Sequence, residues 1–251
     1  MTPYFLTIVA IGVIVAGFVQ GLSGFAFSLV AMSIWAWFLE PHLAAAMAVF
    51  GGFIGQCLAV ASVRRGFDLR LLWPFLLGGL VGVPVGTVLL PHLNIDAFKL
   101  MMGLVLVVWC PAMMMSQRLP RIQASPAADG VIGLIGGLMA GFGGFSGVVP
   151  TLWCALRGFE KDTQRSVIQN FNLGILSATL LAYILSGMIT LEMLPLFAMI
   201  VPAMLIPTLL GTRLYLGITE ATFRKIVLGL LTASGAALLA SSVPILIQRS
   251  L

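Results

Sequence analysis

The sequence predicts an all-α polytopic membrane protein, and three observations carry that prediction. Apolar residues make up 60% of the 251 residues and charged residues only 8%, and the mean hydropathy is +1.12. Soluble domains carry about 25% charged residues, so this chain lacks the polar surface of a water-soluble globule. Its apolar runs, roughly 15 to 24 residues long, show no strict alternation, which favours spanning helices over a closed barrel. A Gly-rich phrase also occurs twice, as AGFVQGLSG at 16–24 and AGFGGFSG at 140–147.

The apolar segments follow one order in each half of the chain: two short segments and then three longer ones. In the first half they cover 3–19, 24–39, 42–63, 71–90 and 98–116. In the second half they cover 130–142, 146–157, 166–188, 191–213 and 224–247. We therefore expect eight to ten helical segments in two repeats, 1–116 and 130–251, joined by a polar cytoplasmic linker at 117–129.

Matching dipeptides support the repeat. Ser23-Gly24 corresponds to Ser146-Gly147 in the two Gly-rich phrases. Gly86-Thr87 corresponds to Gly211-Thr212 near the end of the fourth and ninth segments, and Phe98-Lys99 to Phe223-Arg224 at the start of the fifth and tenth. Each match is weak alone, and it is their shared order that indicates an internal repeat.

The distribution of Lys and Arg predicts the topology. If the sixth and seventh segments enter and leave on one side, eleven basic residues fall on that side and only Lys99 and Arg249 on the other. Fusing these two segments into one span removes the bias. By the positive-inside rule the basic side is cytoplasmic, so both termini lie outside. Each half then inserts with opposite orientation, which is an inverted repeat of the kind common in transporters.

The short segments predict helix hairpins of a re-entrant type. Segments of 12 or 13 residues reach only about 20 Å at about 1.5 Å per residue, against a hydrocarbon core of about 30 Å. One hairpin would turn at 20–23 and the other at 143–146, from opposite faces, so that the two tips meet near the midplane. Broken backbone at that depth is tolerated where it is buried in protein or lines a wet cavity.

These turns carry the groups that suit an anion. The second helix of each hairpin is expected to begin at its Ser-Gly pair, where helix N-termini offer free N–H groups and partial positive charge. Nearby polar side chains could bind a ligand or simply tie helices together, and the sequence leaves both open. The candidate substrate-binding residues are Gln20, Gly21, Ser23, Gly24, Gly144, Ser146, Gly147, Pro150, Thr151, Gln169, Asn170 and Asn172.

Other chemistry has little support in the sequence. We expect no metal site and no cofactor, because no cluster of ligand-type residues, phosphate-binding loop or Ser/His/Asp set is evident. The eight acidic residues fall in loops or at segment ends, whereas a proton relay normally places a carboxylate within the membrane. Gly17, Gly78, Gly82 and Gly137 are better explained by close helix packing. No basic run with interleaved aromatic residues indicates a nucleic-acid partner.

At these residues the chain resembles the sulfite exporter TauE/SafE family of bacterial permeases. The resemblance rests on AGFVQGLSGF at 16–25, GLMAGFGGFSGVVP at 137–150, PHLAAAMAVF at 41–50 and the two-halved layout. It implies a multi-pass protein of the bacterial inner membrane that transports a small sulfur-containing or organic anion. It also implies that the residues contacting the substrate lie in the two turns, at Gly21, Ser23, Gly24, Gly144, Ser146, Gly147 and Pro150.

We therefore predict a secondary carrier or facilitator, not an enzyme, that moves a small anion by alternating access as one half rocks against the other. The alternatives are an intramembrane enzyme, a lipid-handling membrane protein, and an assembly subunit without a solute of its own. The expected partners are the anionic solute and the lipid bilayer. A homo-oligomer is left open.

Overall fold

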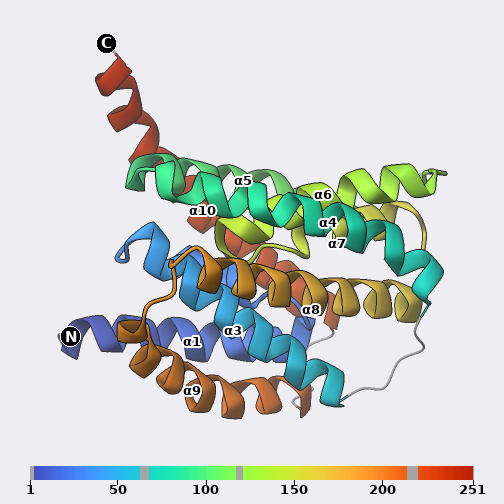
Figure 1. The fold of residues 1–251 in the computed structure, drawn as a ribbon, viewed down its shortest axis with the longest axis horizontal. Helices are drawn as coiled ribbons and strands as arrows, with labels where there is room; N and C mark the ends of the chain where they lie inside the picture. The colour runs from blue at the N-terminus through green and yellow to red at the C-terminus, as the bar shows by residue number, and fades with distance from the viewer. Residues whose placement is uncertain (1–2, 63–67, 117–120, 214–219, 251) are drawn as a thin grey trace.

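The computed structural model describes residues 3–62, 68–116, 121–213 and 220–250, and these form helices without any strand (Figure 1). The longer α-helices, together with two short 3-10 turns, η1 (Leu90–His92) and η3 (Leu191–Met193), form an elongated bundle. The α-helices are α1 (Pro3–Ser23), α2 (Phe27–Trp35), α3 (Pro41–Ser62), α4 (Leu69–Leu89), α5 (Ile95–Met115), α6 (Pro126–Gly143), α7 (Val148–Leu156), α8 (Lys161–Leu185), α9 (Leu194–Arg213) and α10 (Glu220–Ser250).

Eight of these helices are long and apolar enough to cross a membrane. The remaining two, α2 and α7, have nine residues each and reach only about 13 Å at about 1.5 Å per residue. The all-α, multi-pass prediction is therefore confirmed. Each predicted hairpin consists of one long helix and one short helix rather than two short ones.

The boundaries of the hairpins differ from those expected. α1 continues to Ser23 and α2 begins only at Phe27, and α6 begins at Pro126 rather than at 130. Proline suits the first helical position, where its missing N–H needs no partner. The apolar pattern placed Asp129 in the linker, but its carboxylate is buried and ion-paired inside the protein, so the helix can include it. The linker accordingly ends at 125.

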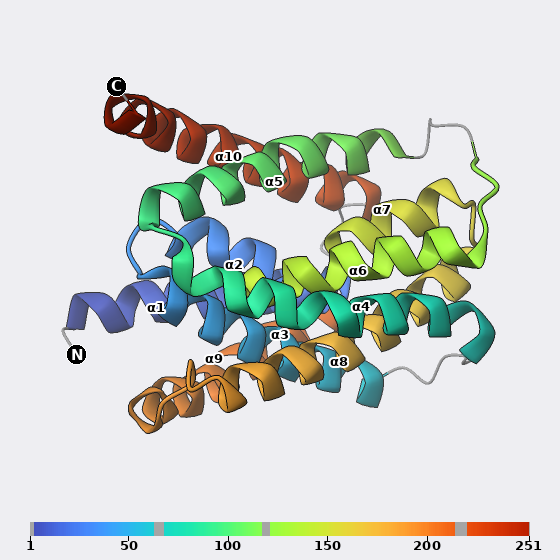
Figure 2. The same ribbon diagram turned by 45° about the horizontal axis from the view of Figure 1, so that its top comes forward.

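The two halves of the chain interleave. The most extensive helix contacts are between α4 and α6, between α5 and α10, and between α1 and α9, and each of these pairs joins the first half to the second (Figure 2). In the repeat, α1 corresponds to α6, α4 to α9 and α5 to α10. When each helix is replaced by its counterpart, the α4–α6 pair becomes the α9–α1 pair, and the α5–α10 pair is unchanged. An internal repeat predicts this pattern of contacts, while the opposite orientation of the halves in the membrane stays a prediction.

Glycines allow the α4–α6 and α1–α9 pairs to approach at backbone distance. A Cβ atom at Gly82 of α4 would lie 2.1 Å from the Leu134 carbonyl oxygen of α6. A Cβ atom at Gly21 of α1 would lie equally close, at 2.1 Å, to the Thr208 carbonyl oxygen of α9. The Thr208 hydroxyl also donates a hydrogen bond of 2.9 Å to the Gly17 carbonyl. These glycines serve the close packing that membrane helices use.

Both termini lie at the same end of the bundle in the two views, together with η1 and η3. The helices α4, α6, α8 and α10 begin at the opposite end, which is also where α7 ends. The α1–α2 hairpin therefore enters from the end that carries the termini, and the α6–α7 hairpin enters from the other end.

Candidate functional site

Each hairpin is broken by one glycine in the left-handed conformation. Gly24 has φ +82° and Gly144 has φ +81°. The Gly24 N–H donates to the Gln20 carbonyl and the Gly144 N–H to the Ala140 carbonyl, both at 2.7 Å. This is the single-bond glycine cap that ends many helices.

The two caps correct the alignment of the repeats. They pair Gly24 with Gly144, which are 120 residues apart (144 − 24). The dipeptide match of Ser23-Gly24 with Ser146-Gly147 is therefore wrong by three residues. Ser23 is the last residue of α1, whereas Ser146 follows its glycine cap. α7 does begin beside its Ser-Gly pair, but α2 begins three residues after Gly24.

Two buried glutamines hold the first turn. The Gln20 side chain accepts a hydrogen bond from the Phe27 N–H at 3.0 Å and donates one to the Gly24 carbonyl at 3.2 Å. Gln56 of α3 donates to the same carbonyl at 2.9 Å, and its Oε1 atom is buried without a partner among the described residues. The Ser23 hydroxyl donates to the Val19 carbonyl at 2.8 Å and accepts from the Ala26 N–H at 3.2 Å. Gln20 and Ser23 thus bridge the break between α1 and α2.

The second turn is built around Asn172 of α8. The Ser146 hydroxyl donates to Asn172 Oδ1 at 2.8 Å, and both side chains are almost completely buried. Gly147 packs directly against the same amide. The Asn172 Nδ2 group has no hydrogen-bond partner among the described residues. α7 starts at Val148, and its N-cap Gly147 gives it no side-chain cap.

The two turns differ in their surroundings. Nothing lies within 4 Å of the position that a Cβ atom would take at Gly24, and the turn from Gly21 to Phe25 is half-buried. At Gly144 a Cβ atom would lie 2.7 Å from the Ser28 hydroxyl and 3.3 Å from the Val49 backbone, and residues 143–148 are buried. Open space therefore adjoins the first turn, whereas the second is sealed by α2 and α3.

Contacts with α3 show that the tips pass each other instead of meeting at one depth. Gly144 lies against Val49 of α3, and Gly24 is bound by Gln56, seven residues further along the same helix. At about 1.5 Å per residue the two turns are offset by about 10 Å along α3. The long arms α1 and α6 cause this overlap, because each runs most of the way through the bundle.

The structure does not bring all the predicted residues to the turns. Gly21 lies in the α1–α9 interface, and Pro150 packs against Gly136 of α6. Thr151 is buried one turn into α7, and its hydroxyl has no partner among the described residues. Asn170 donates to the Ser166 carbonyl of its own helix at 2.8 Å. Gln169 is buried in α8, and no hydrogen bond among the described residues joins its side chain to either turn.

Several residues that shape the turns were not predicted as site residues from the sequence. Tyr183 of α8 donates to the Gly141 carbonyl at 2.7 Å, Ser28 of α2 donates to the Ala48 carbonyl at 3.1 Å, and Trp109 of α5 donates to the Val148 carbonyl. Each lies in an apolar helix and is 20 to 42 residues away from its partner in the sequence. The only sequence signal for a role of these residues is that each carries a polar atom within an otherwise apolar segment.

An ion pair closes the base of the second hairpin. The Arg157 guanidinium at the end of α7 donates to the Asp129 carboxylate in the first turn of α6 at 2.9 Å. The Trp153 indole N–H donates to the same carboxylate at 2.7 Å. The Asp129 side chain is only 5% exposed. These bonds fix the start of α6 to the end of α7.

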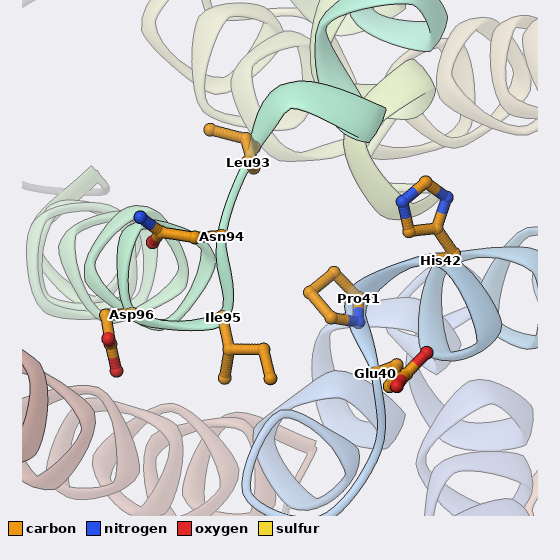
Figure 3. Close-up of a pocket in the computed structure, with 7 residues that line it drawn as sticks. All are labelled: Glu40, Pro41, His42, Leu93, Asn94, Ile95 and Asp96. Carbon is orange, nitrogen blue, oxygen red and sulfur yellow. The ribbon is translucent and has the colours of Figure 1, made fainter.

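A hollow of about 510 Å³ lies at the end of the bundle that carries the termini (Figure 3). Glu40, His42, Asn94 and Asp96 contribute its polar groups. A second hollow beside it adds Glu192. The carboxylates make this region unsuited to holding an anion, and neither lining includes a residue of the glycine turns.

Fold and turns together define a multi-pass α-helical membrane protein with two broken hairpins that enter from opposite ends. Among the described residues no group of His, Cys, Asp and Glu is arranged to hold a metal ion. The sulfite exporter TauE/SafE family model matches residues 8–238, and the chain belongs to this family. Membership implies a membrane transporter of sulfite or a similar anion. No curated protein and no solved structure matches the chain.

Proposed function

We propose that this protein carries a small oxyanion such as sulfite or a sulfonate across the bacterial inner membrane by alternating access, with the anion bound beside the second turn. The observation that carries the proposal is the buried start of α7, which has no side-chain cap and lies next to Asn172. A helix N-terminus favours an anion through the positive end of its dipole; at the start of α7 the Val148 N–H already donates to the Phe145 carbonyl, and Pro150 has no N–H. The Asn172 Nδ2 group adds a donor that no described residue uses.

The arrangement of hydrogen bonds at this position suits an acceptor-only ligand. The Ser146 hydroxyl donates to Asn172 Oδ1, so the Asn172 Nδ2 group is directed away from Ser146. The Thr151 hydroxyl, one turn further along α7, is also buried without a partner among the described residues. An unpaired buried donor costs about 1–3 kcal/mol, and an anion oxygen would satisfy it. Gly147 has no side chain, so its backbone lies directly next to the Asn172 amide.

The first turn supplies the path by which the anion reaches the site. Space beside Gly24 adjoins a half-buried backbone turn that Gln20, Ser23 and Gln56 line with polar groups. The first turn lies deeper than the second as measured from the terminal end, so the anion passes both turns on its way through the bundle. Arg70 near the start of α4, Arg157 at the end of α7 and Arg165 near the start of α8 lie at one end of the bundle, and by the positive-inside rule that end is cytoplasmic.

The moving parts in this proposal are not the two halves of the sequence. The most extensive contacts join α1 to α9 and α4 to α6, so rocking one half against the other would break them. Two units that respect the contacts are α1–α3 with α9, and α6–α8 with α4, which meet along α3 and α8. Each unit carries one glycine turn.

Sulfite-induced stabilisation of the purified protein tests the proposal. A ligand that binds only the folded state raises the unfolding temperature by mass action. We expect sulfite to raise it for the natural protein. In Asn172→Ala, loss of a hydrogen bond to a charged oxygen weakens apparent affinity by about tenfold or more.

Asn170→Ala is the matched control, because Asn170 lies on the same helix but donates to its own backbone. It should retain the natural sulfite response. An Asn172→Ala variant that folds and responds as strongly as Asn170→Ala would refute the site. A natural protein that no sulfite, sulfonate or carboxylate stabilises would refute the function.

A further inference from the structure

Trp109 touches both hairpins. Its indole N–H donates to the Val148 carbonyl at the start of α7. Its ring meets the Phe25 ring of the first turn edge-on, with centroids 6.2 Å apart and planes at 86°. Trp109 itself is only 5% exposed. One buried side chain from α5 therefore contacts the turn at Gly24 and the start of the helix that follows Gly144.

The corresponding helix of the second half makes an analogous but smaller contact. Trp109 lies 11 residues after Phe98, and Ser234 of α10 lies 11 residues after Phe223, so aligning Phe98 with Phe223 pairs the two positions. Ser234 donates to the Ser33 carbonyl of α2 at 3.2 Å. A side chain of α5 thus donates to a backbone carbonyl of α7, and a side chain of α10 donates to a backbone carbonyl of α2. In both cases the short helix belongs to the other half of the chain. Only the tryptophan is large enough to reach the other turn as well.

The positions of the short helices α2 and α7 are sensitive to this contact. α5 contacts the hairpins mainly through α2 and α7, while it packs extensively against α10. A helix of nine residues has few internal hydrogen bonds, and its position depends on tertiary contacts. A rigid bridge between the two turns would therefore transmit a shift of one to the other.

We propose that Trp109 is a positioning residue that couples the two glycine turns, so that the turn at Gly24 and the start of α7 change conformation together. Its indole N–H fixes α7, and its ring fixes Phe25. This coupling goes beyond anion binding and does not depend on which solute is carried.

Hydrogen exchange of Trp109→Phe, followed by mass spectrometry on the full chain in detergent, tests the coupling without any substrate. Losing one ordinary hydrogen bond should speed exchange by about fivefold in residues 148–151. Coupling predicts that exchange also rises in residues 24–27, where the protected amides include Gly24 and Phe27. A rise confined to 148–151, or no rise in either segment, would overturn the proposal.

Trp153→Phe is the matched control. It makes the same substitution, in α7 of the second hairpin, and also loses an indole hydrogen bond, the one to Asp129, but the ring that meets Phe25 edge-on is that of Trp109. It should leave exchange in 24–27 unchanged. An equal rise there in both variants would show general loosening and overturn the coupling.

Phe25→Leu gives the reciprocal measurement and decides the matter if Trp109→Phe does not fold. It removes the ring contact but leaves the Trp109–Val148 hydrogen bond. Because coupling between sites is reciprocal, exchange in 148–151 should rise at least about twofold. Unchanged exchange there would overturn the proposal. Since no step uses an anion, failure here is distinguishable from failure of the proposed transport.

Discussion

At the scale of single residues, Gly24 and Gly144 have nearly the same φ and the same capping hydrogen bond but different neighbours. Left-handed backbone costs an ordinary L-residue about 1–2 kcal/mol. That cost applies equally to both positions. The space available for a side chain differs, because only Gly144 is packed against other helices.

This difference predicts unequal effects of alanine. Gly24→Ala should lower the free energy of unfolding by about 1 kcal/mol. Gly144→Ala should lower it by a further 1 kcal/mol or more, roughly, because the new methyl group overpacks against Ser28 and Val49. Gly229→Ala is the control, since that helical position has no neighbour within 4 Å. Equal losses at Gly24 and Gly144 in chemical unfolding would contradict the packing described.

The sequence predicted a break in each Gly-rich phrase but not which glycine forms it. The second phrase offers Gly141, Gly143, Gly144 and Gly147, and only Gly144 adopts positive φ. Gly141 packs against α4, and Gly147 against Asn172. Contacts with distant helices therefore decide the role of each glycine. For that reason the repeats were aligned three residues out of register.

At the scale of the helices, each hairpin joins a long arm to a short one, and the Asp129–Arg157 pair ties the arms of the second. Removing one partner of a buried ion pair leaves an uncompensated charge. The pair also explains why a carboxylate occurs in a helix with the composition of a membrane span.

Asp129→Ala is therefore expected to lower the free energy of unfolding by about 3–5 kcal/mol. The matched control is Asp68→Ala, which removes an exposed carboxylate that caps α4 through the N–H groups of Arg70 and Leu71. Loss of such a cap costs about 1 kcal/mol. Comparable losses for the two variants in chemical unfolding would mean that the buried pair does not hold the hairpin together.

Sequence signals could have placed the start of α6 more accurately. Ser125 followed by Pro126 is a typical helix start. The apolar pattern alone led to 130, because Asp129 looks like a linker residue. Its partners, Arg157 and Trp153, lie more than 20 residues away, and their proximity to Asp129 depends on how the hairpin folds.

At the scale of the whole molecule, composition predicted the membrane class and eight to ten helical segments, but not that one helix of each hairpin is long enough to span the membrane. The interleaving of the halves was not predictable in the same way. Apolar helices of similar composition give no signal for their partners, and the α4–α6 and α1–α9 pairs follow from glycines that are spread over the chain.

Interleaving predicts that neither half folds alone. If the chain is divided between residues 118 and 119, α1, α4 and α5 each lose their most extensive partner. The separately expressed halves should aggregate on detergent extraction, whereas the coexpressed halves should copurify and show the sulfite response of the full chain. Two halves that are each monodisperse with a cooperative thermal transition would contradict this architecture.

The topology predicts which end a membrane-impermeant maleimide reaches in intact cells. Glu192→Cys is exposed in η3, at the end that carries the termini. Arg121→Cys is exposed at the opposite end, next to Ile122, whose N–H donates to the Leu156 carbonyl at the end of α7. Labelling above that of the natural protein should occur at once for Glu192→Cys and only after permeabilisation for Arg121→Cys. The reverse pattern would place both termini in the cytoplasm.

The central claim is that the anion binds at the second turn, and crystallography with selenite locates it most directly. Selenite has the shape and charge of sulfite and scatters anomalously at the selenium edge. We expect an anomalous peak within hydrogen-bonding reach of Asn172 Nδ2 and the start of α7. A peak at the hollow beside Glu40 and His42 instead, or none at the turn in a protein that selenite stabilises, would contradict the claim.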